Sequence, residues 1–138
     1  MCAFELLFKC SNVGSAHKED EMRNMSFSHT VPQILDGTKD VTRRAAWNSL
    51  KPGDRIRAVK KSMGLKKGEK LEPLAEIEIV DVRRERLYHI TVDDVRREGF
   101  PDMSRYEFVQ LVRGLCHCSS FDYVNRIEFK IIKYLAVE

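Results

Sequence analysis

The feature that most constrains the fold of this chain is a strict alternation of apolar and charged residues near its C-terminal end. In the segment "RIEFKII", Ile127, Phe129 and Ile131 alternate with charged residues, of which the first is Arg126. Successive side chains of a β-strand point to opposite faces of the sheet, so this pattern predicts a strand with one buried face and one wet face. The segment "LAEIEIVDVRR", residues 74–84, alternates in the same way and predicts a second such strand.

Three stretches outside these strands predict short helices with recognisable ends. The first is "VPQILDG", residues 31–37, which has a proline in its first turn and a glycine at its end. The other two begin at capping-box spacings and end at glycines. They run from Thr91, with Asp94 three residues later, to Gly99, and from Ser104, with Glu107 three residues later, to Gly114.

The order of these elements excludes the common nucleotide-binding folds. The chain has no regular β-α-β alternation, no glycine-rich phosphate loop and no internal repeat, which argues against a Rossmann or P-loop enzyme. Strands with interspersed short helices predict an α+β fold, in which a mixed sheet curls into a small β-barrel and short flanking helices cover its openings. A chain of 138 residues has room for one compact domain, which we place at residues 25–138 after an N-terminal extension, residues 1–24.

Composition and cysteine usage restrict the cellular setting and the cofactors. The four cysteines, at positions 2, 10, 116 and 118, lack the spacing of a zinc site, and no secretory signal precedes them. No apolar run approaches the roughly 20 residues that span a bilayer. We therefore expect a cytoplasmic monomer with free thiols, no metal, no other cofactor and no membrane contact.

Positive charge is concentrated in less than a quarter of the sequence. Residues 39–70 contain eleven basic and three acidic residues, a net charge of +8 in a chain whose total is +3. Such a segment attracts polyanions, although a solvated lysine-rich hairpin would have the same composition. If the partner is RNA or another single-stranded nucleic acid, the expected phosphate contacts are Arg43, Arg44, Arg55, Arg57 and Lys60.

The stretch "DGTKDVTRRAAW", residues 36–47, crowds reactive side chains into one connection. In a turn favoured by Gly37 and Asp40, Lys39 and Thr42 would converge at i, i+3 spacing. A lysine whose pKa is depressed by burial or by nearby cations would then lie beside a potential nucleophile. The alternative is a solvated lysine next to a threonine that stabilises the turn.

Three more residues extend this hypothesis. Arg44 offers a planar donor fork, and Trp47 offers a ring on which a base could stack, although a surface salt bridge and ordinary core filling are the alternatives. Glu98 falls at the C-terminal end of the predicted helix 91–99, where the helix dipole disfavours a carboxylate. Compensation by a lysine such as Lys39, a role in acid–base chemistry or a frayed, solvated helix end would each account for it.

From Met25 to Ile132 the chain resembles the ASCH domains of the PUA-like superfamily, particularly the short versions carried by bacteria and their phages. The family motif is G-x-K-x-x-E-x-R, and "GTKDVTRR" supplies Gly37, Lys39 and Arg44, with Thr42 where the motif has glutamate. The segments "LKPGDRI", "REGFPDMSRYEF" and "RIEFKII" are also similar to this family.

The resemblance implies a set of functions. The small acetylcytidine amidohydrolases of the superfamily have a lysine, a threonine three residues later and a distant glutamate, and Lys39, Thr42 and Glu98 match these positions. Other ASCH relatives are implicated in RNA binding or RNA cleavage. The expectations are therefore a module that binds RNA or a nucleobase through a basic pocket, an amidohydrolase that deacetylates a modified nucleoside, or a ribonuclease.

Overall fold

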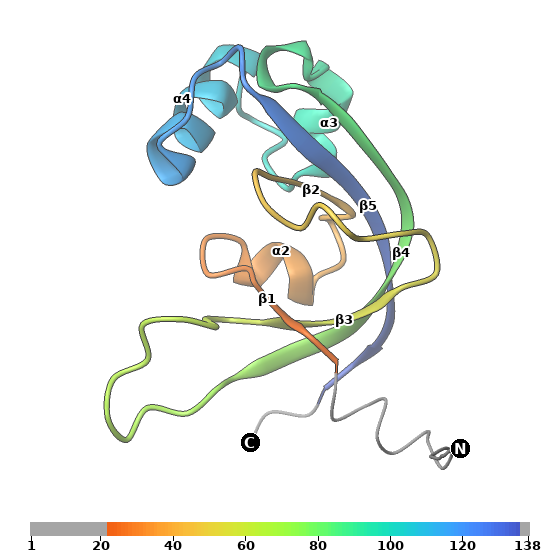
Figure 1. The fold of residues 1–138 in the computed structure, drawn as a ribbon, viewed down its shortest axis with the longest axis vertical. Helices are drawn as coiled ribbons and strands as arrows, with labels where there is room; N and C mark the ends of the chain where they lie inside the picture. Colours follow the sequence, from red (N-terminus) through yellow and green to blue (C-terminus); the bar gives the residue numbers. More distant parts are fainter. Residues whose placement is uncertain (1–21, 136–138) are drawn as a thin grey trace, which may run out of the picture.

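The structure is a computed structural model that describes residues 22–135 (Figure 1). The predicted extension, residues 1–24, lies outside the described residues apart from its last three. The strands are β1 (Asn24–Ser26), β2 (Val41–Arg44), β3 (Arg55–Val59), β4 (Pro73–Arg86) and β5 (Tyr123–Tyr134). The helices are α2 (Val31–Leu35), the 3-10 helix η2 (Leu87–His89), α3 (Val92–Arg97) and α4 (Arg105–Cys116).

The five strands form one mixed sheet in the order β1-β3-β4-β5-β2. β1 is parallel to β3 and the other pairs are antiparallel. The sheet curls into a half-barrel around α2, while α3 and α4 lie at one end of the long β4–β5 pair (Figure 1). The edge strands are connected by a side chain, because Nη2 of Arg44 in β2 donates to the carbonyl oxygen of Ser26 in β1 at 2.6 Å. The predicted α+β architecture with a curled sheet is confirmed.

Two hydrophobic clusters form the interior. The larger one lies between the inner face of the sheet and α2, and it includes Phe27, Ile34, Ile56, Ile77, Ile127 and Phe129. The smaller one lies between α3, α4 and the ends of β4 and β5, and it includes Leu87, Val95, Phe108, Val112 and Val124. Among residues 22–135, no helix is long and apolar enough to cross a bilayer.

The alternation in β5 was correct for the strand but wrong for one of its residues. Arg126 was expected on a wet face, yet it is only 4% exposed. Its Nε donates to Oδ2 of Asp94 in α3 at 2.7 Å. Because α3 packs over this end of the sheet, the charged face of β5 is buried where the helix covers it.

The helix ends agree with the predicted caps, with one exception. The Thr91 hydroxyl accepts a hydrogen bond from the backbone N–H of Asp94, and Ser104 and Glu107 form a complete capping box. The predicted end of the third helix at Gly114 was wrong. α4 continues to Cys116, and His117 adopts the left-handed conformation with φ of 55°. The capping side chains were predictable, whereas a glycine alone did not stop the helix.

Gly99 and Gly114 make a matched pair for a stability measurement. Gly99 has φ of +106°, and a Cβ there would lie 2.7 Å from Cγ of Gln33, so Gly99→Ala should lower the free energy of unfolding by at least about 1 kcal/mol. A Cβ at Gly114 would meet nothing within 4 Å, so Gly114→Ala should raise it by up to about 1 kcal/mol. Urea unfolding measures both values, and equal effects would contradict this account.

Candidate active site

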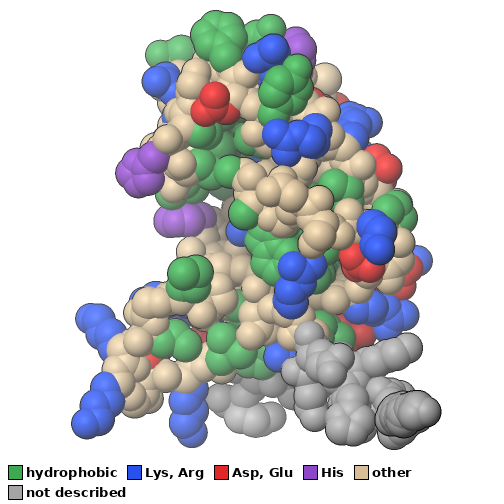
Figure 2. Space-filling model, viewed as in Figure 1, with side chains coloured by type: hydrophobic (Ala, Val, Ile, Leu, Met, Phe, Trp, Pro, Cys, Tyr) green, Lys and Arg blue, Asp and Glu red, His purple; other side chains and the backbone are tan. Residues whose placement is uncertain are grey.

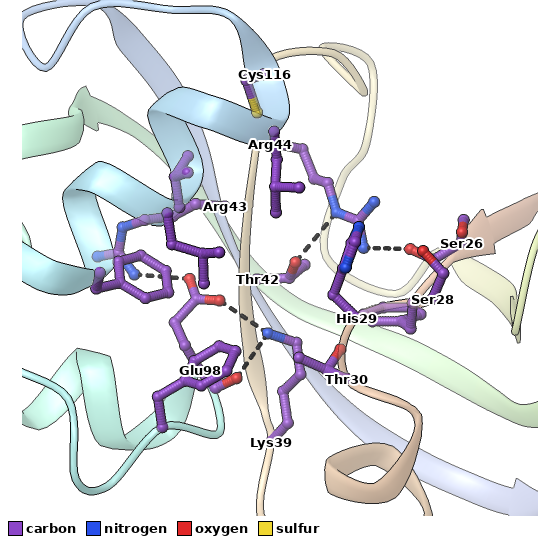
Figure 3. Close-up of a pocket in the computed structure, with 16 residues that line it drawn as sticks. Ser26, Ser28, His29, Thr30, Lys39, Thr42, Arg43, Arg44, Glu98 and Cys116 are labelled. Atoms are coloured by element: carbon purple, nitrogen blue, oxygen red, sulfur yellow. Dashed lines mark hydrogen bonds and ion pairs between the residues drawn. The ribbon is translucent and has the colours of Figure 1, made fainter.

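A cavity of about 280 Å³ lies where β2 meets the β1–α2 connection, the end of α3 and one face of α4 (Figure 3). One wall is polar and carries Lys39, Thr42, Arg44 and Glu98. The opposite wall is apolar and consists of Phe100, Phe108, Leu111, Val112 and Leu115. The cavity therefore combines reactive groups on one side with an apolar surface on the other, which is typical of small-molecule sites.

Lys39 and Glu98 form a buried ion pair across the polar wall. The Lys39 amine donates to Oε1 of Glu98 at 2.8 Å and to the backbone oxygen of the same residue at 2.8 Å. The two side chains are 4% and 3% exposed. Glu98 caps the C-terminal end of α3, so the expected compensation of this carboxylate by a lysine is found.

Burial changes the proton affinity of Lys39. Removal from water disfavours the ammonium form, and the Glu98 carboxylate favours it. Burial outweighs the carboxylate, and the cations of Arg44 and Arg43 act in the same direction as burial, so the pKa of Lys39 lies below its ordinary value of 10.5. The amine is thereby shifted toward the neutral form that can accept a proton.

Thr42 is held in place by its strand and by Arg44. The two residues are two positions apart in β2, and Nε of Arg44 donates to Oγ1 of Thr42 at 3.1 Å. The Arg44 guanidinium also lies 4.8 Å from the centre of the Phe27 ring. Because Oγ1 accepts this hydrogen bond, the hydroxyl proton of Thr42 remains available to another acceptor.

Thr42 and Lys39 reach this pocket by a route that differs from the expected turn. Thr42 belongs to strand β2, whereas Lys39 precedes the strand and is fixed by its backbone N–H, which donates to the Gln33 carbonyl oxygen at 3.2 Å. Figure 3 shows Lys39, Thr42, Arg44 and Glu98 directed into one space. The convergence therefore depends on long-range packing of α3 against β2, not on i, i+3 geometry.

Arg43 belongs to a buried ion network beside the cavity. Its side chain is 1% exposed, and it donates to Glu85 and Asp94 at 2.6 Å each and to Oε2 of Glu98 at 3.1 Å. With its donors engaged by three carboxylates, Arg43 is not presented to a phosphate as the sequence had suggested. It instead fixes the second carboxylate oxygen of Glu98 and is a positioning residue.

Asp94 connects this network to β5. It accepts hydrogen bonds from Arg43 and from Arg126, which lies opposite Arg43 in the β2–β5 pair. Burial opposes ionisation of Asp94, but the hydrogen bonds from the two arginines outweigh it and hold the pKa of this carboxyl well below its ordinary value. Its helical capping position was readable from sequence, but its buried partners were not.

The other predicted ligand-binding residues do not line the cavity. Arg55 pairs with Glu76 and Glu78 across β3 and β4 at 2.9 and 3.2 Å. Arg57 donates to Asn24 at 3.1 Å, and the Lys60 amine lies 4.0 Å from a carboxylate oxygen of Glu72. The structure thus disperses these three cations along the β3–β4 hairpin.

Gly37 and Trp47, near the two ends of residues 36–47, also lie outside the cavity. Gly37 follows α2 with φ of +79°. Trp47 is partly buried against the larger hydrophobic cluster, and the guanidinium of Arg23 lies 4.6 Å from its ring centre. Both the core-filling interpretation and a cation–π contact therefore apply to Trp47.

Sequence reasoning missed the apolar wall and the mouth of the cavity. Leu111 and Leu115 lie on the apolar side of α4, and Leu115 is 46% exposed beside the cavity. His29 and Ser28 lie in the exposed turn after β1 and also line the cavity. The i, i+4 spacing of the two leucines was visible in the sequence, but only tertiary packing shows which part of an apolar stripe borders a cavity.

The curled sheet and its short helices define the class of protein as a small α+β domain built on a half-barrel. Among solved structures, the chain is similar to an ASCH domain from Lactobacillus crispatus JV V101, with a TM-score of 0.61 and 19% identity over 89% of this chain and 87% of that one. It is also similar to a DUF984 protein from Enterococcus faecalis V583 (TM-score 0.60, 12% identity, 81% and 77% covered). A third similar structure is hypothetical protein PH0355 (TM-score 0.56, 18% identity, 80% and 97% covered).

The protein therefore has the fold of an ASCH domain, as the sequence resemblance implied. No protein-family model and no curated protein sequence matches the chain.

Proposed function

We propose that this protein is a metal-independent amidohydrolase that removes the acyl group from an acylated cytosine nucleobase or nucleoside. The observation that carries the proposal is the convergence of the Lys39 amine, the Thr42 hydroxyl and the Glu98 carboxylate in one cavity. A volume of about 280 Å³ suits a small molecule better than a polymer, and the apolar wall offers a surface for a planar ring.

Each group has a role in a balanced reaction. The neutral Lys39 amine takes the proton of Thr42 as Oγ1 attacks the acyl carbon, so that a C–O ester bond forms and the amide C–N bond breaks. Glu98, in contact with the Lys39 amine, relays this proton to the departing exocyclic amine. A water molecule then cleaves the threonine ester, which releases the carboxylic acid and restores the hydroxyl.

The residues around this set support it through position and charge. Arg44 orients the Thr42 oxygen and lies next to the negative charge that this oxygen gains as Lys39 removes its proton. Arg43 fixes the Glu98 carboxylate from the other side, so that the carboxylate is held between an amine and a guanidinium. Both arginines act through their neighbours.

The rate should rise with pH through the lowered pKa of Lys39. Only the neutral amine accepts the proton of Thr42, so kcat/KM for acetylated cytidine is expected to increase as the pH passes this pKa from below, with a midpoint under 10.5. Initial rates between about pH 6 and pH 10 measure the profile. A profile that is flat over this range would exclude Lys39 as the base.

Glu98→Gln tests the carboxylate. The amide has the same shape but does not relay a proton, so kcat should fall by about 10²-fold or more. Glu72→Gln is the matched control because Glu72 is exposed on the β3–β4 hairpin. The turnover of this variant should equal that of the wild type. Release of cytidine from acetylated cytidine provides the measurement, and equal rates for the two variants would remove Glu98 from the mechanism.

The same protein preparation separates hydrolysis from the other two functions. If acetylated cytidine binds but is not converted, the cavity is a binding site for a nucleobase. If labelled single-stranded RNA is shortened while acetylated cytidine is untouched, the protein is a ribonuclease. Conversion of the nucleoside that Thr42→Val abolishes supports the amidohydrolase.

A further inference from the structure

A surface of arginine and aromatic side chains, hereafter the arginine–aromatic surface, extends from the ends of β4 and β5 near α3 to the β2–β3 connection and the residue before β1. Its members are Arg23, Trp47, Arg84, Arg86, Phe121 and Tyr123. Phe121 is 62% exposed and Tyr123 is 49% exposed, and Arg84 is exposed beside them. Figure 2 shows basic and hydrophobic side chains interleaved over the top of the view and down the face toward the viewer.

The sheet register explains why these side chains share one face. Arg86 lies opposite Tyr123 and Arg84 lies opposite Asn125 in the antiparallel β4–β5 pair. Val124, the intervening residue, points to the other face and is buried in the smaller hydrophobic cluster with α3 and α4. The helices therefore cover one face of this end of the sheet and leave the opposite face to the arginines and Tyr123.

The surface consists of cations placed over rings. The guanidinium of Arg86 lies 4.5 Å from the centre of the Tyr123 ring, and that of Arg84 lies 5.7 Å from the same ring. Nη1 of Arg84 donates to Asn48 at 3.2 Å, and Asn48 follows Trp47, whose ring carries Arg23. Asn48 thus connects two cation–π sites into one continuous band.

Within residues 22–135, no carboxylate forms an ion pair with Arg23, Arg84 or Arg86. Arg84 bonds to amide oxygens, and Arg86 donates to the carbonyl oxygen of Phe121. By contrast, Arg55 of the basic segment is paired with two glutamates. This surface therefore offers arginine charge that no carboxylate of the described residues pairs with, at a place separate from the lysine-rich hairpin.

We propose that the arginine–aromatic surface binds single-stranded nucleic acid. Unstacked bases lie on exposed aromatic rings and on guanidinium planes, and phosphates take the remaining arginine donors. A duplex hides the faces of its bases, so it would use only the charge of this surface. None of the six residues lines the cavity, so this proposal stands independently of the amidohydrolase activity.

The test is fluorescence anisotropy with labelled single-stranded RNA, single-stranded DNA and duplex of equal length. The double variant Arg84→Lys with Arg86→Lys keeps the charge and removes the guanidinium planes, and it should weaken single-strand binding at least tenfold, the scale of stacking lost from one or two bases. Tyr123→Ala should weaken it similarly, whereas Tyr123→Phe should retain it. The ratio of RNA to DNA affinity distinguishes the two sources of single strands.

The matched control is Lys66→Ala with Lys67→Ala, which removes two exposed cations from the β3–β4 hairpin. This control should change affinity less than threefold, and all variants should turn over acetylated cytidine as the wild type does. The proposal is overturned if the lysine control loses more affinity than the arginine variant, if duplex binds as tightly as single strands, or if phosphatidylserine vesicles bind and RNA does not.

Discussion

Thr42→Val is expected to reduce the turnover of acetylated cytidine by at least about 10³-fold, because valine has the shape of threonine but no nucleophilic oxygen. The affinity for the nucleoside should change only a few-fold, since the cavity keeps its volume and its apolar wall. Steady-state release of cytidine gives kcat, and calorimetric titration gives the affinity. A loss of kcat without a loss of binding is the signature of a group that acts in the reaction itself.

Thr38→Val is the matched control for this result. Thr38 lies in the same connection, is exposed and donates its hydroxyl to Asp36 at 2.7 Å, outside the cavity. Its turnover should remain within about twofold of the wild type, as expected for an exposed position away from the reacting groups. If Thr42→Val and Thr38→Val are equally active, a water molecule must be the nucleophile and the ester intermediate does not form.

Asp94→Ala should lower the free energy of unfolding by about 3–5 kcal/mol, because it leaves two buried arginines without their shared carboxylate. Arg43 and Arg126 have side chains only 1% and 5% exposed, so water does not replace the lost partner. Urea unfolding at neutral pH measures the change. A loss below about 1 kcal/mol, the scale of a surface ion pair, would show that the network adds little to the fold.

Asp93→Ala supplies the control, since Asp93 is the preceding residue of α3 and forms an exposed ion pair with Arg96. It should change the free energy of unfolding by no more than about 0.5 kcal/mol.

The contribution of Asp94 to stability depends on pH with a definite sign. The pKa of Asp94 is lower in the folded than in the unfolded chain, so its stabilisation is complete above the ordinary aspartate pKa of about 3.9 and is lost as the pH falls toward the folded-state value.

The parts of the structure that depend on local rules were predictable from the sequence. The caps at Thr91 and Ser104 depend on residues three positions apart. The alternation around Ile127 follows from the two-residue period with which side chains point to opposite faces of any strand. A cation near Glu98 was one of three alternatives that followed from the place of this residue at a helix end. The cation is Lys39, which lies 59 positions away in the sequence, and no local rule identifies a partner at that separation.

The parts that depend on which elements pack together were not predictable. A strand pattern gives two faces but does not say that α3 covers the charged face of β5, so the burial of Arg126 was missed. The count of charges along the sequence predicted nucleic-acid contacts at Arg55 and Lys60. It contains no information on the glutamates that lie across the hairpin from them, which are Glu72, Glu76 and Glu78. Arg84 and Arg86 flank Glu85 in the sequence, yet neither forms an ion pair with a carboxylate among residues 22–135.

The guanidinium of Arg44 joins the two edge strands of the sheet by a hydrogen bond and also contacts the proposed nucleophile. It reaches the carbonyl of Ser26 on one strand and the hydroxyl of Thr42 on the other. A single guanidinium therefore supports both the contact between the edge strands and the orientation of the hydroxyl, so a displacement of Arg44 alters the two together.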